Sequence, residues 1–282
     1  MIEASSRHPH DEPIAVRRMD FTFDESTPTC WFDDNPYLTA IMTALAVSFP
    51  PGERYFIRSV RHFLDQVDDP ALREAVRAFV GQEANHTKEH LAFNRFLDSR
   101  GLPATPMEEW VTRRVERIQE VSGPAGNLAR TAALEHFTAI LAEALLAHPE
   151  ITEKMSPEVA RLWVWHAIEE VEHRSVAFDV YEEAVGDEAL RLRVMAFVTV
   201  IFIAMNVARA AILLRATGRV FEPRAALKAL NVLWGKPGLF RKVIPQYLRY
   251  YRRGFHPSEH DNRELVRRAK ARWLGGPKAA AA

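Results

Sequence analysis

Residues 165–173 read WHAIEEVEH, a sequence in which Glu170 and His173 form a Glu-x-x-His element. The earlier sequence GQEANHTKEH contains a second such element, formed by Glu83 and His86. On an α-helix, residues three apart lie on one face with Cβ atoms about 5–6 Å apart, so a carboxylate and an imidazole can bind the same metal ion. The two elements therefore predict two neighbouring helices that hold metal ions between them.

Two further glutamates complete the pattern. Glu53 precedes the first element, and Glu135 lies between the two elements in an apolar stretch, where a buried carboxylate is costly without a partner such as a metal ion. Two Glu-x-x-His elements and one glutamate from each of two more helices make the dinuclear site of ferritin-like four-helix bundles. We therefore predict a dinuclear site in which the glutamates of the two elements bridge the metals and their histidines supply one nitrogen to each.

His166 extends the second element, because it lies four residues before Glu170 and seven before His173 on the same helical face. We predict His166 as a seventh ligand, which would increase the nitrogen character of one metal. A third histidine at this spacing resembles the di-iron arylamine N-oxygenases. Two points stay open: Glu169 could replace Glu170 as the ligand, and His90 could be a ligand, a support for a ligand or a structural residue.

Helix start and stop signals occur throughout the chain and strand signals are scarce, which predicts an all-α protein of about nine helices. We expect a ferritin-like four-helix bundle over about residues 36–186, with additional N- and C-terminal helices, the latter over about 190–273. Residues 35–273 are expected to form a single helical domain. Residues 1–34 are predicted to be a mobile N-terminal arm, and residues 274–282 a disordered tail.

Composition limits the classes of partner and compartment. The chain has 282 residues, is 48% hydrophobic, and balances 37 basic against 37 acidic residues, which gives no reason to expect nucleic acid as a partner. Cys30 is the single cysteine, so neither an intrachain disulfide nor a cysteine-ligated cluster can form. The polar N-terminus lacks the apolar region of a signal peptide. We therefore expect a cytoplasmic protein whose redox chemistry would need electrons from outside the chain.

Residues 194–214 are almost continuously apolar and long enough to cross a bilayer. Asn206 and Arg209 interrupt them, and an arginine inside a membrane span is costly. We interpret this segment as a buried helix or as an oligomer interface, which would make the protein a homodimer. The alternative is a membrane-seated helix that gives access to lipid-like substrates and makes the protein membrane-associated.

Four motifs resemble a bacterial family of predicted metal-dependent hydrolases: FPPGE (49–53), FVGQEANH (79–86), WHAIEEVEH (165–173) and YRRGFHP (251–257). The resemblance covers most of residues 35–260, and it implies a metal site but no particular reaction. The ligand positions that the resemblance implies are Glu53, Glu83, His86, Glu135, His166, Glu170 and His173.

The ligand set of four glutamates and three histidines favours a non-haem di-iron oxygenase or oxidase. Such an enzyme would use two Fe ions, or alternatively a Mn/Fe pair or Zn, with O₂ as co-substrate to oxidise a small, apolar organic substrate. An external donor such as a ferredoxin and its reductase would supply electrons. The alternative is a dinuclear metal-dependent hydrolase in which the metals activate water. Iron storage is disfavoured by the long C-terminal region and the third histidine.

Overall fold

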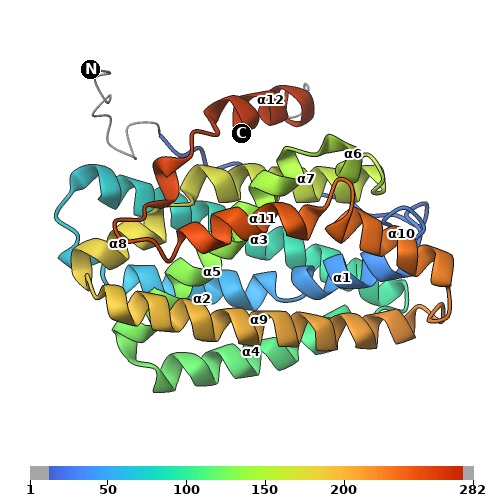
Figure 1. Ribbon diagram of the computed structural model, residues 1–282, viewed down its shortest axis with the longest axis horizontal. Helices are drawn as coiled ribbons and strands as arrows, with labels where there is room; N and C mark the ends of the chain where they lie inside the picture. Colours follow the sequence, from blue (N-terminus) through green and yellow to red (C-terminus); the bar gives the residue numbers. More distant parts are fainter. Residues whose placement is uncertain (1–12, 276–282) are drawn as a thin grey trace.

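The computed structural model describes residues 13–275. This part of the chain contains twelve α-helices and two short 3₁₀ segments. It contains no strand beyond an isolated bridge between Phe32 and Met155. The prediction of an all-α bundle is confirmed. Figure 1 shows the long helices running side by side along the longest axis of the molecule.

Four helices form the centre of the bundle. They are α2 (Phe49–Arg61), α3 (Pro70–Ser99), α5 (Gly123–Leu146) and α7 (Pro157–His173). α2 packs along α3, and α5 packs along both α2 and α7. These are the helices that carry the two Glu-x-x-His elements and the two further glutamates.

Local signals explain where α3 begins and do not explain where α7 ends. Asp69 caps α3, because its carboxylate accepts hydrogen bonds from the first backbone N–H groups and Pro70 occupies the first helical position. The sequence predicts one helix from residue 157 to residue 185, but the structure breaks it into α7 and α8 (Val176–Ala184). No proline or glycine marks this break, so the sequence pattern gave no signal for it.

The remaining helices cover the central four. Their bounds are α1 (Pro36–Ala46), α4 (Ala104–Val121), α6 (Pro149–Thr152), α9 (Glu188–Ala216), α10 (Pro223–Trp234), α11 (Leu239–Arg249) and α12 (Arg263–Trp273). α9 lies along α1 and α5, α11 lies on α5, and α12 lies on α7 (Figure 1). The C-terminal helices therefore pack against the bundle that holds the candidate site.

The N-terminal segment differs from the predicted mobile arm. Trp31 and Phe32 are each 1% exposed and Phe21 is buried, and all three belong to the main hydrophobic core. Burial of these aromatic rings stabilises residues 13–34 against the bundle, although the segment has no helical periodicity. Residues 1–12 of the predicted arm, and residues 276–282 of the predicted tail, lie outside the described residues.

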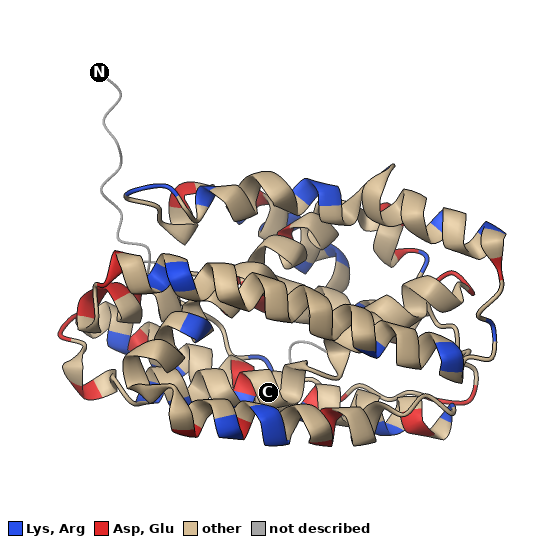
Figure 2. Cartoon of the chain, turned by 60° about the horizontal axis from the view of Figure 1, so that its bottom comes forward, with Lys and Arg blue, Asp and Glu red and all other residues tan. Residues whose placement is uncertain are grey.

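α9 is long and apolar enough to cross a membrane, yet only 17% of its most apolar window is buried. The interpretation of residues 194–214 as a helix buried within the chain is therefore wrong. Its inner face packs on α1 and α5, and its outer face is exposed. Residues 194–208 of α9 contain no charged side chain, and Figure 2 shows most of this helix in the colour of uncharged residues.

Candidate metal centre

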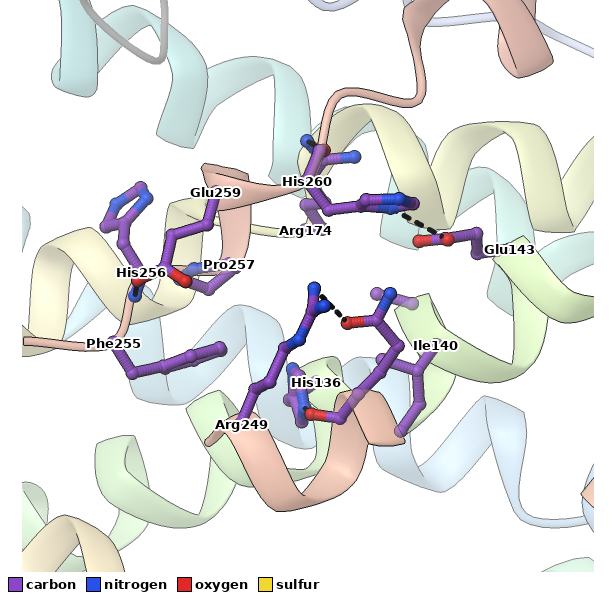
Figure 3. Close-up of a pocket in the computed structure, with 12 residues that line it drawn as sticks. His136, Ile140, Glu143, Arg174, Arg249, Phe255, His256, Pro257, Glu259 and His260 are labelled. Atoms are coloured by element: carbon purple, nitrogen blue, oxygen red, sulfur yellow. Dashed lines mark hydrogen bonds and ion pairs between the residues drawn. The ribbon is translucent and has the colours of Figure 1, made fainter. Parts of the chain in front are cut away.

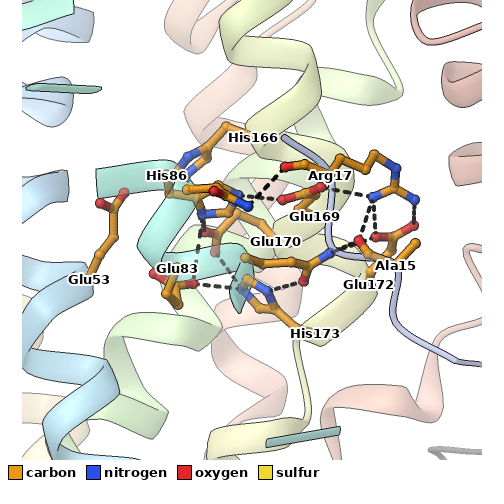
Figure 4. Close-up of polar contacts among 12 residues, drawn as sticks. Ala15, Arg17, Glu53, Glu83, His86, His166, Glu169, Glu170, Glu172 and His173 are labelled. Carbon is orange, nitrogen blue, oxygen red and sulfur yellow. Dashed lines mark hydrogen bonds and ion pairs between the residues drawn. The ribbon is translucent and has the colours of Figure 1, made fainter. Parts of the chain in front are cut away.

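All seven predicted ligands converge in the interior of the bundle. Each is at most 4% exposed, which removes all of them from the surface. α5 supplies Glu135. α2 supplies Glu53, and the two Glu-x-x-His helices α3 and α7 supply the others (Figure 4).

Two groups of three side chains mark two adjacent positions for a metal ion. The groups are Glu53, His86 and His166, and Glu83, Glu135 and His173. Within each group the candidate ligand atoms lie within 4.8 Å of one another. A third set contains Glu83, His86 and Glu170 and therefore joins the two groups. This is the arrangement expected of a dinuclear centre with shared carboxylates.

Glu170 lies between the two positions. Its Oε1 is 3.2 Å from Nε2 of His166 and 3.6 Å from Nδ1 of His86. Its Oε2 is 3.6 Å from Nε2 of His173, which belongs to the other group. Because one carboxylate oxygen faces each position, Glu170 is placed to bridge two metal ions.

Glu83 faces both positions as well. Its Oε1 lies 3.2 Å from Nε2 of His173 and 3.8 Å from Nδ1 of His86. On the second position, Glu135 Oε2 lies 3.3 Å from the same His173 nitrogen. Both glutamates of the two Glu-x-x-His elements are thus in the central places that the sequence pattern assigns to them.

Each of the three histidines uses one ring nitrogen to fix its orientation and turns the other toward the carboxylates. The partners are Glu169 Oε2 for His86 Nε2 at 3.0 Å, Gln82 Oε1 for His173 Nδ1 at 2.9 Å, and His90 Nε2 for His166 Nδ1 at 3.0 Å. The remaining ring nitrogens have no hydrogen-bond partner among the described residues. Histidine ligands of metals are typically oriented in this way through the nitrogen that does not bind the metal.

The same contacts bear on the two points that the sequence left open. Glu169 turns away from the shared centre, because one of its oxygens meets His86 and the other meets Arg17. Glu170, one residue later, occupies the shared place. His90 contacts His166 and belongs to none of the candidate ligand groups among residues 13–275, so its position is that of a support for a ligand.

The electrostatics of the site fit bound cations. Burial raises the pKa of Glu53 and Glu83 well above the ordinary value, and raises that of Glu135 to about 7. Burial also opposes ionisation of Glu170, but the neighbouring His166 and His173 outweigh it and hold its pKa well below the usual range. Glu83 and Glu135 have no hydrogen-bond partner for either carboxylate oxygen among the described residues. Several buried carboxylates side by side are unfavourable as anions unless cations neutralise them.

Arg17 connects the N-terminal segment to the site, a role that no sequence motif predicts. It donates from Nη1 to Glu169 Oε1 (2.9 Å) and to Glu172 Oε2 (2.7 Å), and from Nη2 to Glu172 Oε1 (2.7 Å). Gln82 Nε2 also donates to Glu172, while its carbonyl oxygen faces His173. Figure 4 shows this network beside the ligands. No periodicity or motif links Arg17 to residues more than 150 positions away, so only the folded chain identifies it.

Substituting Arg17 with alanine is expected to lower the free energy of unfolding by about 2–4 kcal/mol, because the buried Glu169 loses its cation and Glu172 keeps only Lys270 as its cation. Chemical denaturation followed by circular dichroism measures this change. The neighbouring, exposed Arg18 provides the matched control, and Arg18→Ala is expected to change stability by less than about 0.5 kcal/mol. Equal effects of the two substitutions would show that the Arg17 network does not stabilise the protein.

A separate group of titratable residues lies between α5 and the C-terminal segment (Figure 3). His136 Nε2 donates to the Gln246 carbonyl oxygen at 3.2 Å, and burial lowers its pKa to about 4. His260 pairs with Glu143 at 2.9 Å. None of these residues belongs to the candidate ligand groups of the described chain, so His136 supports packing although it follows Glu135 directly.

Comparison with known proteins gives one family. A family model described as "Predicted metal-dependent hydrolase" matches residues 15–261. No curated protein and no solved structure matches the chain. The matched region contains Arg17, all seven candidate ligands and helices α1 to α11.

Proposed function

Because the chain belongs to the family of predicted metal-dependent hydrolases, we propose that it is a metal enzyme whose seven buried ligands hold two iron ions, and that it acts as an oxygenase or oxidase. The observation that carries the proposal is the shared placement of Glu83 and Glu170 between two groups that each contain histidine. Carboxylate-bridged pairs of this kind, on four helices, are the sites of ferritin-like di-iron proteins.

The donor set favours iron over the alternatives. Oxygen and imidazole ligands without thiolate suit iron and manganese, and also accept zinc. His86 and His166 belong to one position, whereas His173 alone serves the other, so the two metals would differ in nitrogen content. Bound ferrous ions would supply the binding and reduction of O₂. A Mn/Fe pair remains the first alternative within the same chemistry.

The residues of the chain would exclude water and hold the ligands in place. The Phe49 ring stacks on His166 with centroids 4.6 Å apart, and the Trp165 ring meets His86 edge-on at 4.8 Å. Phe79 packs in the same edge-on manner against His173 at 4.9 Å. Such an apolar surrounding suits oxidation of an apolar substrate, because it keeps water from the reacting atoms.

Electrons would come from a separate protein. The chain has one cysteine, Cys30, which is buried in the core, so it can form no redox disulfide of its own. We propose an external donor, such as a ferredoxin with its reductase, and a cytoplasmic location in which such donors occur. Nucleic acid is not expected as a partner of a chain with balanced charge.

Anaerobic addition of Fe(II) is expected to load about two irons per chain, and subsequent O₂ should produce a transient visible absorption. Iron content is measured by elemental analysis and the absorption by stopped-flow spectroscopy. A His136→Gln variant serves as control, because this buried histidine lies outside the ligand groups. A protein that binds one metal, or none, would contradict the proposal.

Hydrolysis is the second candidate, and the family description is the observation that favours it. Two metals can activate water for attack on an ester or amide. A colourless, zinc-loaded protein that hydrolyses generic esters, and that shows no reaction of its ferrous form with O₂, would support hydrolysis over oxidation. The apolar packing of Phe49 and Trp165 around the histidines is the reason for preferring oxidation.

A further inference from the structure

A large apolar cavity lies beside the candidate metal centre, between α1, α5, α9, α10 and α11. Its volume is about 670 Å³, within the range of sites that bind small organic molecules. No charged side chain lines it among the described residues, and its few polar groups include Thr199, Asn206 and Tyr247. A cavity of this composition suits a hydrocarbon group and not a polar or ionic one.

A second, smaller space adjoins the cavity on the side of the metal centre. Leu45, Leu141 and Phe202 line both spaces. The smaller one is also lined by Phe49 and His166, the ligand on which Phe49 stacks. An extended apolar group that fills the large cavity would therefore point one end toward His166.

The outer end of the cavity opens on an exposed apolar surface, defined here as the outward faces of α9, α10 and α11. Ile203, Val207, Trp234 and Leu248 line the cavity and are each about half exposed or more. Further exposed side chains on α9, such as Val200, continue the same surface. Contiguous exposed apolar side chains of this kind mark a binding surface.

The part of the chain that contains α9, α10 and α11 carries a large excess of positive charge. Residues 189–258 contain thirteen lysines and arginines and one acidic residue, Glu222, although the whole chain is balanced. Arg193 and Arg215 are exposed, and they lie at the two ends of the apolar stripe of α9 that contains Val207. Basic residues around an exposed apolar face are typical of proteins that bind the surface of anionic membranes.

The position of Arg209 argues against a helix that spans the membrane. Arg209 lies on the opposite side of α9 from Val207, is buried, and donates from Nη2 to Asn206 Oδ1 at 3.0 Å. A single spanning helix would be surrounded by lipid, whereas α9 packs one face along α1 and α5 of the bundle. The packing fits a helix that lies in the plane of the interface with one face in the protein.

We propose that the α9–α11 surface docks on an anionic membrane, and that the cavity behind it takes up the hydrocarbon chain of a membrane lipid. The excess of basic residues favours an anionic membrane as the partner, and the two adjoining apolar spaces favour a hydrocarbon chain as the ligand. The inference rests on the proposed function in one respect only, namely that the bound hydrocarbon chain of the lipid would be the substrate of the metal centre. Membrane docking and binding of the lipid's hydrocarbon chain do not depend on which metal is bound.

Docking is tested by sedimentation of the full-length purified protein with phosphatidylcholine vesicles, with and without phosphatidylglycerol. We expect binding only to the anionic vesicles, weakened by salt. Val207→Glu and the double substitution Arg193→Glu/Arg215→Glu should each weaken it about tenfold or more. Val121→Glu is the matched control, because Val121 on α4 is 64% exposed, as is Val207. Equal binding by all variants would overturn the proposal.

A second copy of the chain is the competing occupant of this surface. Light scattering of the same variants separates the two. If Val207→Glu turned a dimer into a monomer and left vesicle binding unchanged, the surface would be a subunit interface and the proposal would be wrong. A monomeric parent protein that binds anionic vesicles is the expected result.

Binding of a hydrocarbon chain in the cavity is tested with cis-parinaric acid, a fatty acid whose fluorescence rises in an apolar site. Leu141→Trp adds bulk to the wall that the two spaces share, and Ala210→Phe fills the large cavity. Each is expected to weaken binding about tenfold, with circular dichroism and metal content unchanged. Unaltered binding in both folded variants would exclude the cavity as the site. Because metal content is recorded separately, failure of lipid binding is distinct from failure of iron loading.

Discussion

Substituting Glu170 with glutamine is expected to abolish loading of the second metal ion, so that the metal content falls from about two per chain to one or fewer. Glu170 is the carboxylate that directs one oxygen to His166 and His86 and the other to His173. Glutamine keeps the size of the side chain but loses the negative charge and one ligand oxygen. Both metal positions are therefore weakened by a single substitution.

The size of this effect follows from the shared position. Substitution of a residue that only orients a metal ligand typically lowers metal affinity by about 10–100-fold. Loss of a shared ligand should therefore lower the metal affinity by more than about 100-fold. Elemental analysis and titration of the metal-free protein measure it. Glu158→Gln is the control, since Glu158 lies in the first turn of the same helix and is partly exposed. A Glu170→Gln protein that still binds two metals with parent affinity would show that another carboxylate bridges them.

Removal of the metals is expected to lower the thermal unfolding midpoint by on the order of 10 °C. Ligands that bind only the folded state at about 1,000 times their dissociation constant stabilise it by about 4 kcal/mol. The physical cause here is that burial opposes ionisation of Glu53, Glu83 and Glu135, and that these carboxylates lie close enough to repel one another. Metal ions would remove both the desolvation cost and the mutual repulsion.

Differential scanning fluorimetry before and after treatment with a chelator measures this change. Metal added back should restore the midpoint in the parent protein, and should restore much less of it in Glu170→Gln. A midpoint that does not respond to chelator or to added metal would mean that the cluster is stable as neutral acids, held by protons and not by metal ions.

Helical periodicity predicted the two Glu-x-x-His pairs among the candidate ligands. The Glu-x-x-His spacing is local, since three positions on a helix return a side chain to the same face whatever surrounds it. Glu83 and His86, and likewise Glu170 and His173, therefore needed only the helices to be identified correctly. The proline-marked starts of α3 and α7 supplied that information.

Other features depend on how the helices rotate and pack. The roles of Glu169 and Glu170 differ by one position, or about 100° around the helix, and only the placement of α7 against α3 assigns the shared place to Glu170. Arg17 reaches the site through a segment without regular structure, so no periodic pattern could predict its contacts.

The amino-acid sequence alone predicted an all-α chain and the two Glu-x-x-His elements, because both follow from residue type and helical spacing. It predicted the seven candidate ligands from the order of these elements, two further glutamates and His166, and the family from the resemblance of four motifs. The tertiary structure decided which oxygen faces which nitrogen, what orients each histidine, and that α9 turns an apolar face outward beside a cavity. Those properties arise from contacts between segments distant in the chain, whose geometry is set by packing and not by local periodicity.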